Sequence, residues 1–139
     1  MMNLTTTQNI DPAYQDWGKA YDELCTLITT KVPAVKHVDL YYGQEQAIDQ
    51  DGNWIPFQSP AVFIEFNAAE VDDIGDDSQQ ILMDITVFLS METLQDSNHG
   101  SKGKRRAMLF VDLMRELHVA LHNAQGDHFS PLSRVALRR

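Results

Sequence analysis

The histidines near the C-terminal end of the chain come closest to a reactive arrangement of residues. His118 and His122 are four residues apart, a spacing that places both imidazoles on one face of a helix, and Asp127 and His128 follow closely. Imidazole and carboxylate groups are zinc ligands, so one hypothesis is a small metal-dependent enzyme built on these four residues. The zinc-protease pattern is absent, because Val119 rather than a glutamate base follows His118. We favour a simpler interpretation, in which histidines near a helix C-terminus interact with the helix dipole and no metal or other cofactor is bound.

The remaining nucleophiles and acids do not form a catalytic pattern either. Cys25 has no basic or histidine neighbour in sequence to activate its thiol, and no serine stands in a Gly-x-Ser-x-Gly turn. Glu65 and Asp84 could act as an acid–base pair if they were buried together, but polar positions facing solvent or an interface are commoner. The sequence therefore predicts a protein that is not an enzyme. A single cysteine also excludes an intramolecular disulfide and is typical of a reducing compartment.

Two clusters of opposite charge are more informative. The acidic cluster surrounds Gly75, and the basic cluster lies at the predicted start of a helix, where the helix dipole disfavours cations. The first lacks the distal glutamate of a calcium loop, and the second lacks the glycine and hydroxyl residues of a phosphate loop. We therefore predict that the clusters meet, either within one chain or between neighbouring subunits. They consist of Glu70, Asp72, Asp73, Asp76 and Asp77 and of Lys102, Lys104, Arg105 and Arg106.

Length and charge limit the class of protein. The chain has 139 residues, a usual size for one domain, and its 11 basic and 20 acidic side chains give a net charge of −9. Such a charge opposes nucleic-acid binding, which needs clustered cations. No signal sequence and no long apolar run is present, so we expect neither export nor membrane insertion. We predict a cytoplasmic protein with a flexible tail at residues 1–10, which are poor in apolar groups, and a single domain at residues 11–139.

The spacing of apolar residues predicts two main helices. In the first, apolar residues recur every three or four positions after Asp11 and Pro12, which suit the start of a helix. The second extends from Lys104 to Ala124, with Gly126 as a left-handed stop. Its expected core stripe is Ala107, Phe110, Val111, Met114, Leu117, His118 and Leu121.

Period-two alternation predicts about four strands. The two central ones, within residues 60–90, each have one apolar and one mixed face, as expected when helices cover one side of a sheet. A turn is predicted at residues 49–53, inside a hairpin-like excursion at residues 43–59. The expected fold is α+β, with a mixed or antiparallel sheet and both helices packed on one face. The strands are predicted at residues 35–42, 60–66, 80–90 and, along an edge, 129–137.

The order of these elements resembles that of a known protein family. An amphipathic helix is followed by a Val-Pro-Ala-Val strand, by Trp-Ile-Pro-Phe at residues 54–57 and by Ser-Pro-Ala-Val-Phe-Ile-Glu-Phe at residues 59–66. A strand ending in Val-Phe-Leu, a helix with Leu-His-Val-Ala-Leu-His and the segment Gly-Asp-His-Phe-Ser-Pro-Leu-Ser-Arg at residues 126–134 complete the pattern. In this order of elements the chain resembles the tail-terminator and tail-completion proteins of long-tailed bacteriophages and related prophages.

The resemblance implies a small α+β subunit that assembles into a ring, commonly a hexamer, which caps the tail tube and joins it to the head. The implied partners are further copies of the chain, tail-tube proteins and head-completion proteins, in the cytoplasm of a bacterial host and in the virion. It implies interface surfaces and no active site. Family members usually carry another strand after Phe-Ser-Pro-Leu-x-Arg, whereas this sequence stops at Arg139, so an unpaired sheet edge is expected. Two alternatives stay open: the metal-dependent enzyme, and a generic intracellular module that binds proteins through its sheet edge.

Overall fold

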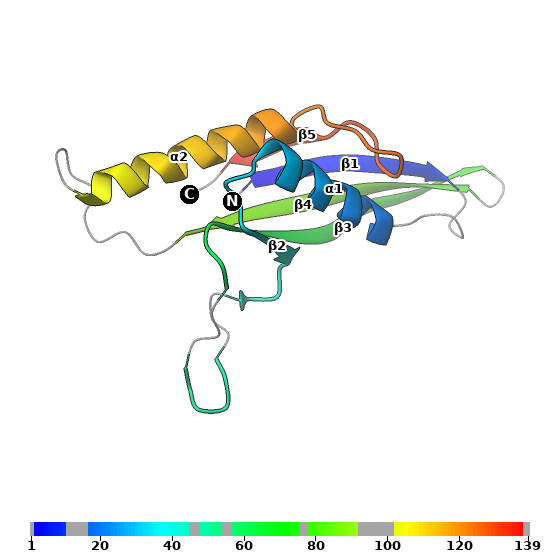
Figure 1. Ribbon diagram of the computed structural model, residues 1–139. Helices are drawn as coiled ribbons and strands as arrows, with labels where there is room; N and C mark the ends of the chain where they lie inside the picture. The colour runs from blue at the N-terminus through cyan, green and yellow to red at the C-terminus, as the bar shows by residue number, and fades with distance from the viewer. Residues whose placement is uncertain are drawn as a thin grey trace.

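The computed structural model describes residues 2–10, 17–44, 48–53, 57–75, 78–91 and 102–137, and the structural statements below refer to these residues. Five strands form one sheet in the order β2-β3-β4-β1-β5, and two helices pack against it (Figure 1). β2 is parallel to β3, and the other neighbouring strands are antiparallel. The predicted α+β fold with a mixed sheet is confirmed, with more strands than expected. The elements are β1 (Met2–Ile10), α1 (Trp17–Lys31), β2 (His37–Leu40), β3 (Ala61–Gly75), β4 (Ser78–Ser90), α2 (Lys102–Leu121) and β5 (Ser133–Leu137).

The N-terminal segment is an inner strand of the sheet, so the prediction of a flexible tail at residues 1–10 is wrong. β1 lies between β4 and β5 and pairs with both. Met2 and Leu4 are fully buried, and the Thr6 hydroxyl donates a 2.6 Å hydrogen bond to the Ser130 carbonyl. The low apolar content of residues 1–10 did not predict this strand, because in a strand that is paired on both sides only every second side chain needs to face the core. Its threonines also favour strand conformation.

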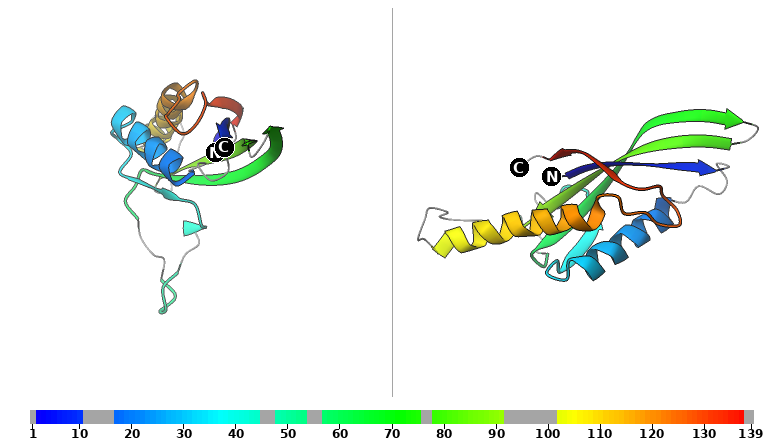
Figure 2. Two further views of the ribbon diagram at one scale, coloured as in Figure 1. Left: turned by 90° about the vertical axis from the view of Figure 1, so that its right-hand side faces the viewer. Right: turned by 90° about the horizontal axis from the view of Figure 1, so that it is seen from above.

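β3 and β4 form a long hairpin that reaches one extreme of the molecule (Figure 1 and Figure 2). β3 is longer than the strand predicted at residues 60–66, because pairing continues through the acidic segment: Asp72 lies opposite Gln80 and Asp73 opposite Gln79. A bulge between Ala68 and Glu70 shifts the register on the way. The predicted end of this strand at Phe66 was therefore wrong, because the antiparallel ladder outweighs the weak strand propensity of aspartate.

Both helices cover the same face of the sheet (Figure 2). α1 buries Ala20, Leu24 and Ile28, as its spacing predicted. Its expected start at Asp11 and Pro12 lies outside the described residues. The shared core includes strand residues from the apolar faces of β1, β3 and β4: Met2, Leu4, Val62, Ile64, Met83, Ile85 and Val87.

α2 buries one side of its C-terminal half, whereas its N-terminal half projects past the end of the sheet (Figure 1 and Figure 2). Leu113, Leu117 and Leu121 are fully buried. Val111, which was expected in the core, is exposed, and Leu113 was missing from the predicted stripe. We name residues 102–112 of α2 the overhang.

The C-terminal end of α2 is fixed by Asn123 rather than by Gly126. Asn123 has a positive φ of 62°, which asparagine tolerates better than most residues, and its N–H donates to the Leu132 carbonyl at 2.8 Å. Gly126 has another role, because an added Cβ would collide with the carboxylate of Glu23 and lie 2.6 Å from the ring of Phe129. The left-handed stop predicted at Gly126 is therefore wrong, and this glycine instead allows the Glu23 and Phe129 side chains to pack close to the backbone.

The opposite face of the sheet has a smaller aromatic cluster. Phe63 is buried there by Phe57, with ring centroids 5.0 Å apart, and by His37, at 6.0 Å. Tyr41 stacks on Phe88 at 4.3 Å. The excursion between β2 and β3 extends away from this face (Figure 1), and its predicted turn is confirmed by a 2.8 Å hydrogen bond from the Asp49 N–H to the Asn53 carbonyl.

Candidate interaction surfaces

The far end of the β3–β4 hairpin has an exposed surface that we name the acidic tip, formed by Glu70, Val71, Asp72 and Asp73. Val71 is 52% exposed, although valine usually favours burial. The Gln79 amide donates to the Asp73 carboxylate at 3.2 Å. The predicted partners Asp76 and Asp77 lie outside the described residues. No lysine or arginine occurs between Lys36 and Lys102 in the sequence, so the whole hairpin lacks basic side chains.

The overhang combines basic and apolar side chains. Lys102 is its first residue, Lys104 is half-buried and Arg105 is exposed, while the side chains of Lys102 and Arg106 lie outside the described part. Met108, Leu109 and Val111 are 48%, 45% and 40% exposed. Three large apolar side chains close together on a projecting helix are typical of a protein–protein contact surface.

The two charged surfaces lie at opposite ends of the molecule. In Figure 1 the start of α2 is at the left end and the acidic tip at the right end, and the view from above in Figure 2 agrees. The version of our prediction in which the acidic and basic clusters meet within one chain is therefore wrong. Contact between these surfaces requires two copies of the chain.

The four candidate metal ligands are divided between two places. His118 and His122 stack on α2, with ring centroids 5.2 Å apart. His128 instead faces α1, where its Nδ1 lies 2.7 Å from the Glu23 carboxylate, and Asp127 lines a groove beside α1. Within the described ranges, no group of three or more His, Cys, Asp or Glu side chains is arranged to hold a metal ion.

The environment of His118 disfavours its charged form. Burial lowers the pKa of its imidazole, and the positive charge of Arg134 on β5 and the neighbouring His122 lower it further. Its Nδ1 is buried without a hydrogen-bond partner among the described residues. The positive charge of Arg134 beside this imidazole opposes a metal cation at the same place.

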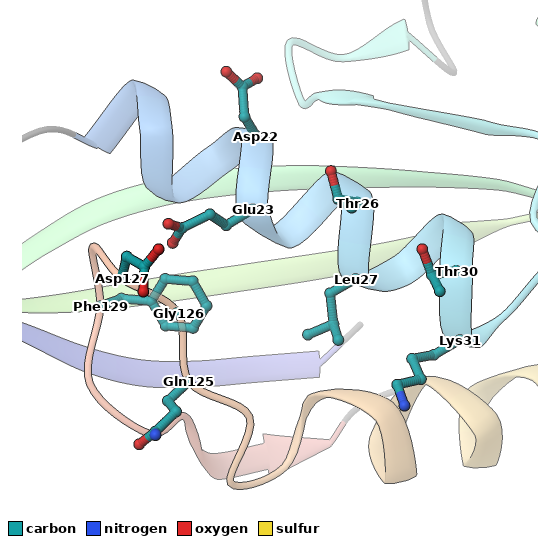
Figure 3. Close-up of a pocket in the computed structure, with 10 residues that line it drawn as sticks. All are labelled: Asp22, Glu23, Thr26, Leu27, Thr30, Lys31, Gln125, Gly126, Asp127 and Phe129. Atoms are coloured by element: carbon teal, nitrogen blue, oxygen red, sulfur yellow. The ribbon is translucent and has the colours of Figure 1, made fainter.

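A groove lies between α1 and the segment after α2. It has a volume of about 500 Å³, and in Figure 3 Glu23 points from α1 toward Asp127 and Phe129. A second hollow of about 720 Å³ continues it between α1 and α2, because Leu27, Lys31 and Gln125 line both. No local sequence pattern predicts this groove, since its two walls are about a hundred residues apart along the chain.

The other candidate reactive groups lie apart from the groove's centre or are not activated. Burial raises the pKa of the Cys25 thiol, and the hydrogen bond with Tyr21 offsets this only in part, so the thiol stays protonated at neutral pH. Glu65 and Asp84 lie on the face away from the helices, opposite Thr86 and Asn67 respectively, so they are diagonal neighbours. Both are half-buried. Neither arrangement provides an activated nucleophile.

Comparisons with family models, curated proteins and solved structures find no match for this chain. Among the described residues, no helix has the length and apolar character needed to cross a membrane.

Proposed function

We propose that this protein is a structural subunit of a phage or prophage tail, similar to tail-terminator proteins. In this proposal it associates with further copies of itself, as a ring, and docks at the end of the tail tube or at the head–tail junction. It assembles in the cytoplasm of the bacterial host and becomes part of the virion. In this proposal the protein acts by binding to its own copies and to tail or head proteins, and it catalyses no reaction.

The placement of the two exposed surfaces at opposite ends carries this proposal. An acidic surface and a basic, apolar surface on one elongated subunit complement each other only between copies. Such a contact uses two different patches, so it is head-to-tail, and repetition of a head-to-tail contact produces a closed ring or an open filament. The order of elements in the sequence, which resembles that of tail terminators, favours the ring.

The test is the mass of the assembly in solution. We expect sedimentation velocity to show oligomers whose share grows with protein concentration and decreases as salt screens the opposed charges. Electron microscopy of the largest species should show rings, and addition of the tail-tube protein encoded beside the same gene should shift the protein into tube ends. A strict monomer at high concentration, with or without that tube protein, would refute the proposal.

A second candidate function is an intracellular module that binds extended peptides. The short strand β2 pairs with only Ala61–Ile64 of β3, so the outer edge of β3 beyond Ile64 has no strand partner among the described residues. An open edge can accept an added strand from a partner. Under this alternative the protein stays monomeric and the amides of Glu65–Asn67 become protected from hydrogen exchange when the partner is added. Protection there without self-association would favour the module over the tail subunit.

A further inference from the structure

We infer that the acidic tip of one copy binds the overhang of the next copy, with Val71 seated among the exposed apolar side chains of that helix. The inference rests on the proposed function and adds the pair of surfaces that form the contact. The occupant of the overhang is thus a second copy of this chain. It is identified by charge and by the position of the two surfaces.

The overhang exposes apolar groups on two sides of one helix. Leu109 continues the four-residue spacing of Leu113, Leu117 and Leu121, so it belongs to the stripe that is buried farther along, and yet it is 45% exposed. Met108 and Val111 lie on the other side of the helix with Lys104, at spacings of four and seven residues. A helix with apolar side chains on both sides is expected to be enclosed by a partner.

The acidic tip has the complementary character. Val71 is an exposed apolar residue between acidic neighbours on a hairpin without basic side chains, whereas the overhang has exposed apolar residues next to Lys104 and Arg105. Pairing of the two surfaces would bury Val71 together with Met108, Leu109 or Val111 and place carboxylates beside cations. Contact between two overhangs, or between two tips, would oppose like charges.

Charge reversal tests the electrostatic part of the contact. Asp72→Lys with Asp73→Lys, and separately Lys104→Glu with Arg105→Glu, should each weaken association by about tenfold or more. A mixture of the two double variants should restore association to near the wild-type level, because opposite charges then face each other again. The control for the acidic-tip variant is Asp51→Lys with Glu116→Lys, which makes the same change in net charge at exposed positions elsewhere and should leave association within about threefold of wild type. Circular dichroism and thermal melting confirm that each variant is folded.

Cross-linking tests the position of the contact. In a Cys25→Ser background, Val71→Cys protein mixed with Met108→Cys protein should form an intermolecular cross-link with a short bis-maleimide. Val119→Cys is the matched control, because Val119 is also exposed on α2 but lies beyond the overhang. We expect the Val71→Cys and Val119→Cys mixture to give little product.

The outcomes separate this inference from the proposed function. If the wild-type protein associates but neither charge reversal weakens it, or if the Val119→Cys mixture cross-links as well as the Met108→Cys mixture, the assigned contact is wrong and self-association stands. If the wild-type protein does not associate at any concentration and no cross-link forms, both the contact and autonomous assembly are refuted. Loss of association in both reversals, restoration on mixing and a cross-link specific to Met108→Cys support the contact.

Discussion

The two halves of α2 have the same leucine pattern and opposite surroundings. Leu109, Leu113, Leu117 and Leu121 follow one another at four-residue intervals, and their exposed fractions are 45%, 1%, 0% and 0%. The change occurs where the helix passes the end of the sheet (Figure 1). An amphipathic pattern therefore shows which side of a helix is apolar but not what covers it. In the C-terminal half the cover is the chain's own sheet, and in the overhang we propose that it is a second copy.

The contrast between the two halves of α2 predicts that truncation of a buried leucine will have the largest effect on stability. Leu117→Ala should lower the free energy of unfolding by about 2–5 kcal/mol, because it opens a cavity in the core. Leu109→Ala should cost less than about 1 kcal/mol in the monomer, since much of that side chain is already in water. Urea denaturation at low protein concentration measures both. Equal losses from the two variants would show that the overhang is packed against its own chain.

The packing around Gly126 should produce the next largest effect. This residue lies under the Glu23 carboxylate, which also accepts a hydrogen bond from the His128 N–H at 3.3 Å, so the segment after α2 is held against α1. Gly126→Ala should destabilise the protein by about 1–3 kcal/mol through overpacking. Gly18→Ala, at an exposed position of α1, is the matched control and should be neutral or stabilising by up to about 1 kcal/mol. Destabilisation by Gly18→Ala alone would contradict this account of the C-terminal anchor.

The sequence predicted the features that depend on local periodicity. The α+β class, the buried stripe of α1, the strand at residues 80–90 and the turn at residues 49–53 all follow from spacing and turn chemistry, and the structure confirms them. The two charged clusters were also visible, since charge is a property of the sequence itself. These predictions needed no knowledge of distant contacts.

The features that the sequence did not predict depend on contacts between distant segments. β1 is an inner strand because β4 and β5 pair with it on both sides, and no property of residues 1–10 alone shows those partners. The acidic segment is strand because its partner, β4, continues the ladder. Likewise, Leu109 is exposed although it continues the buried leucine stripe, because the start of α2 projects past the end of the sheet. The charged residues of the two candidate surfaces could be predicted from the sequence. Their positions at opposite ends of the molecule could not, because those positions depend on the fold.

A smaller, pH-dependent effect should be confined to the C-terminal half of α2. Burial, Arg134 and His122 hold the pKa of His118 below its ordinary value of 6.5, so the unfolded chain binds this proton more readily than the folded one. The contribution of His118 to stability is therefore complete above about pH 6.5 and decreases as the pH falls through 6.5 toward the lower pKa of the folded state. His118→Gln should reduce the loss of stability between pH 7.5 and 5.5, measured by the urea midpoint at each pH. An unaltered pH dependence in His118→Gln would contradict the assigned environment.

The smallest effect on stability is expected in the overhang itself. Met108→Gln combined with Val111→Gln should change the free energy of unfolding of the monomer by less than about 0.5 kcal/mol, because glutamine favours helix more than valine does and little buried area is lost. The same variant should weaken association, since it removes apolar groups that we assign to the contact between copies. Hydrogen exchange provides the second measurement: amides of residues 108–112 should exchange faster than those of residues 113–121 in the monomer, and should become protected when the copies associate. Strong protection of both halves in a dilute monomer would mean that the two halves of α2 are equally anchored. That result would contradict the proposed contrast between a packed C-terminal half and an uncovered overhang.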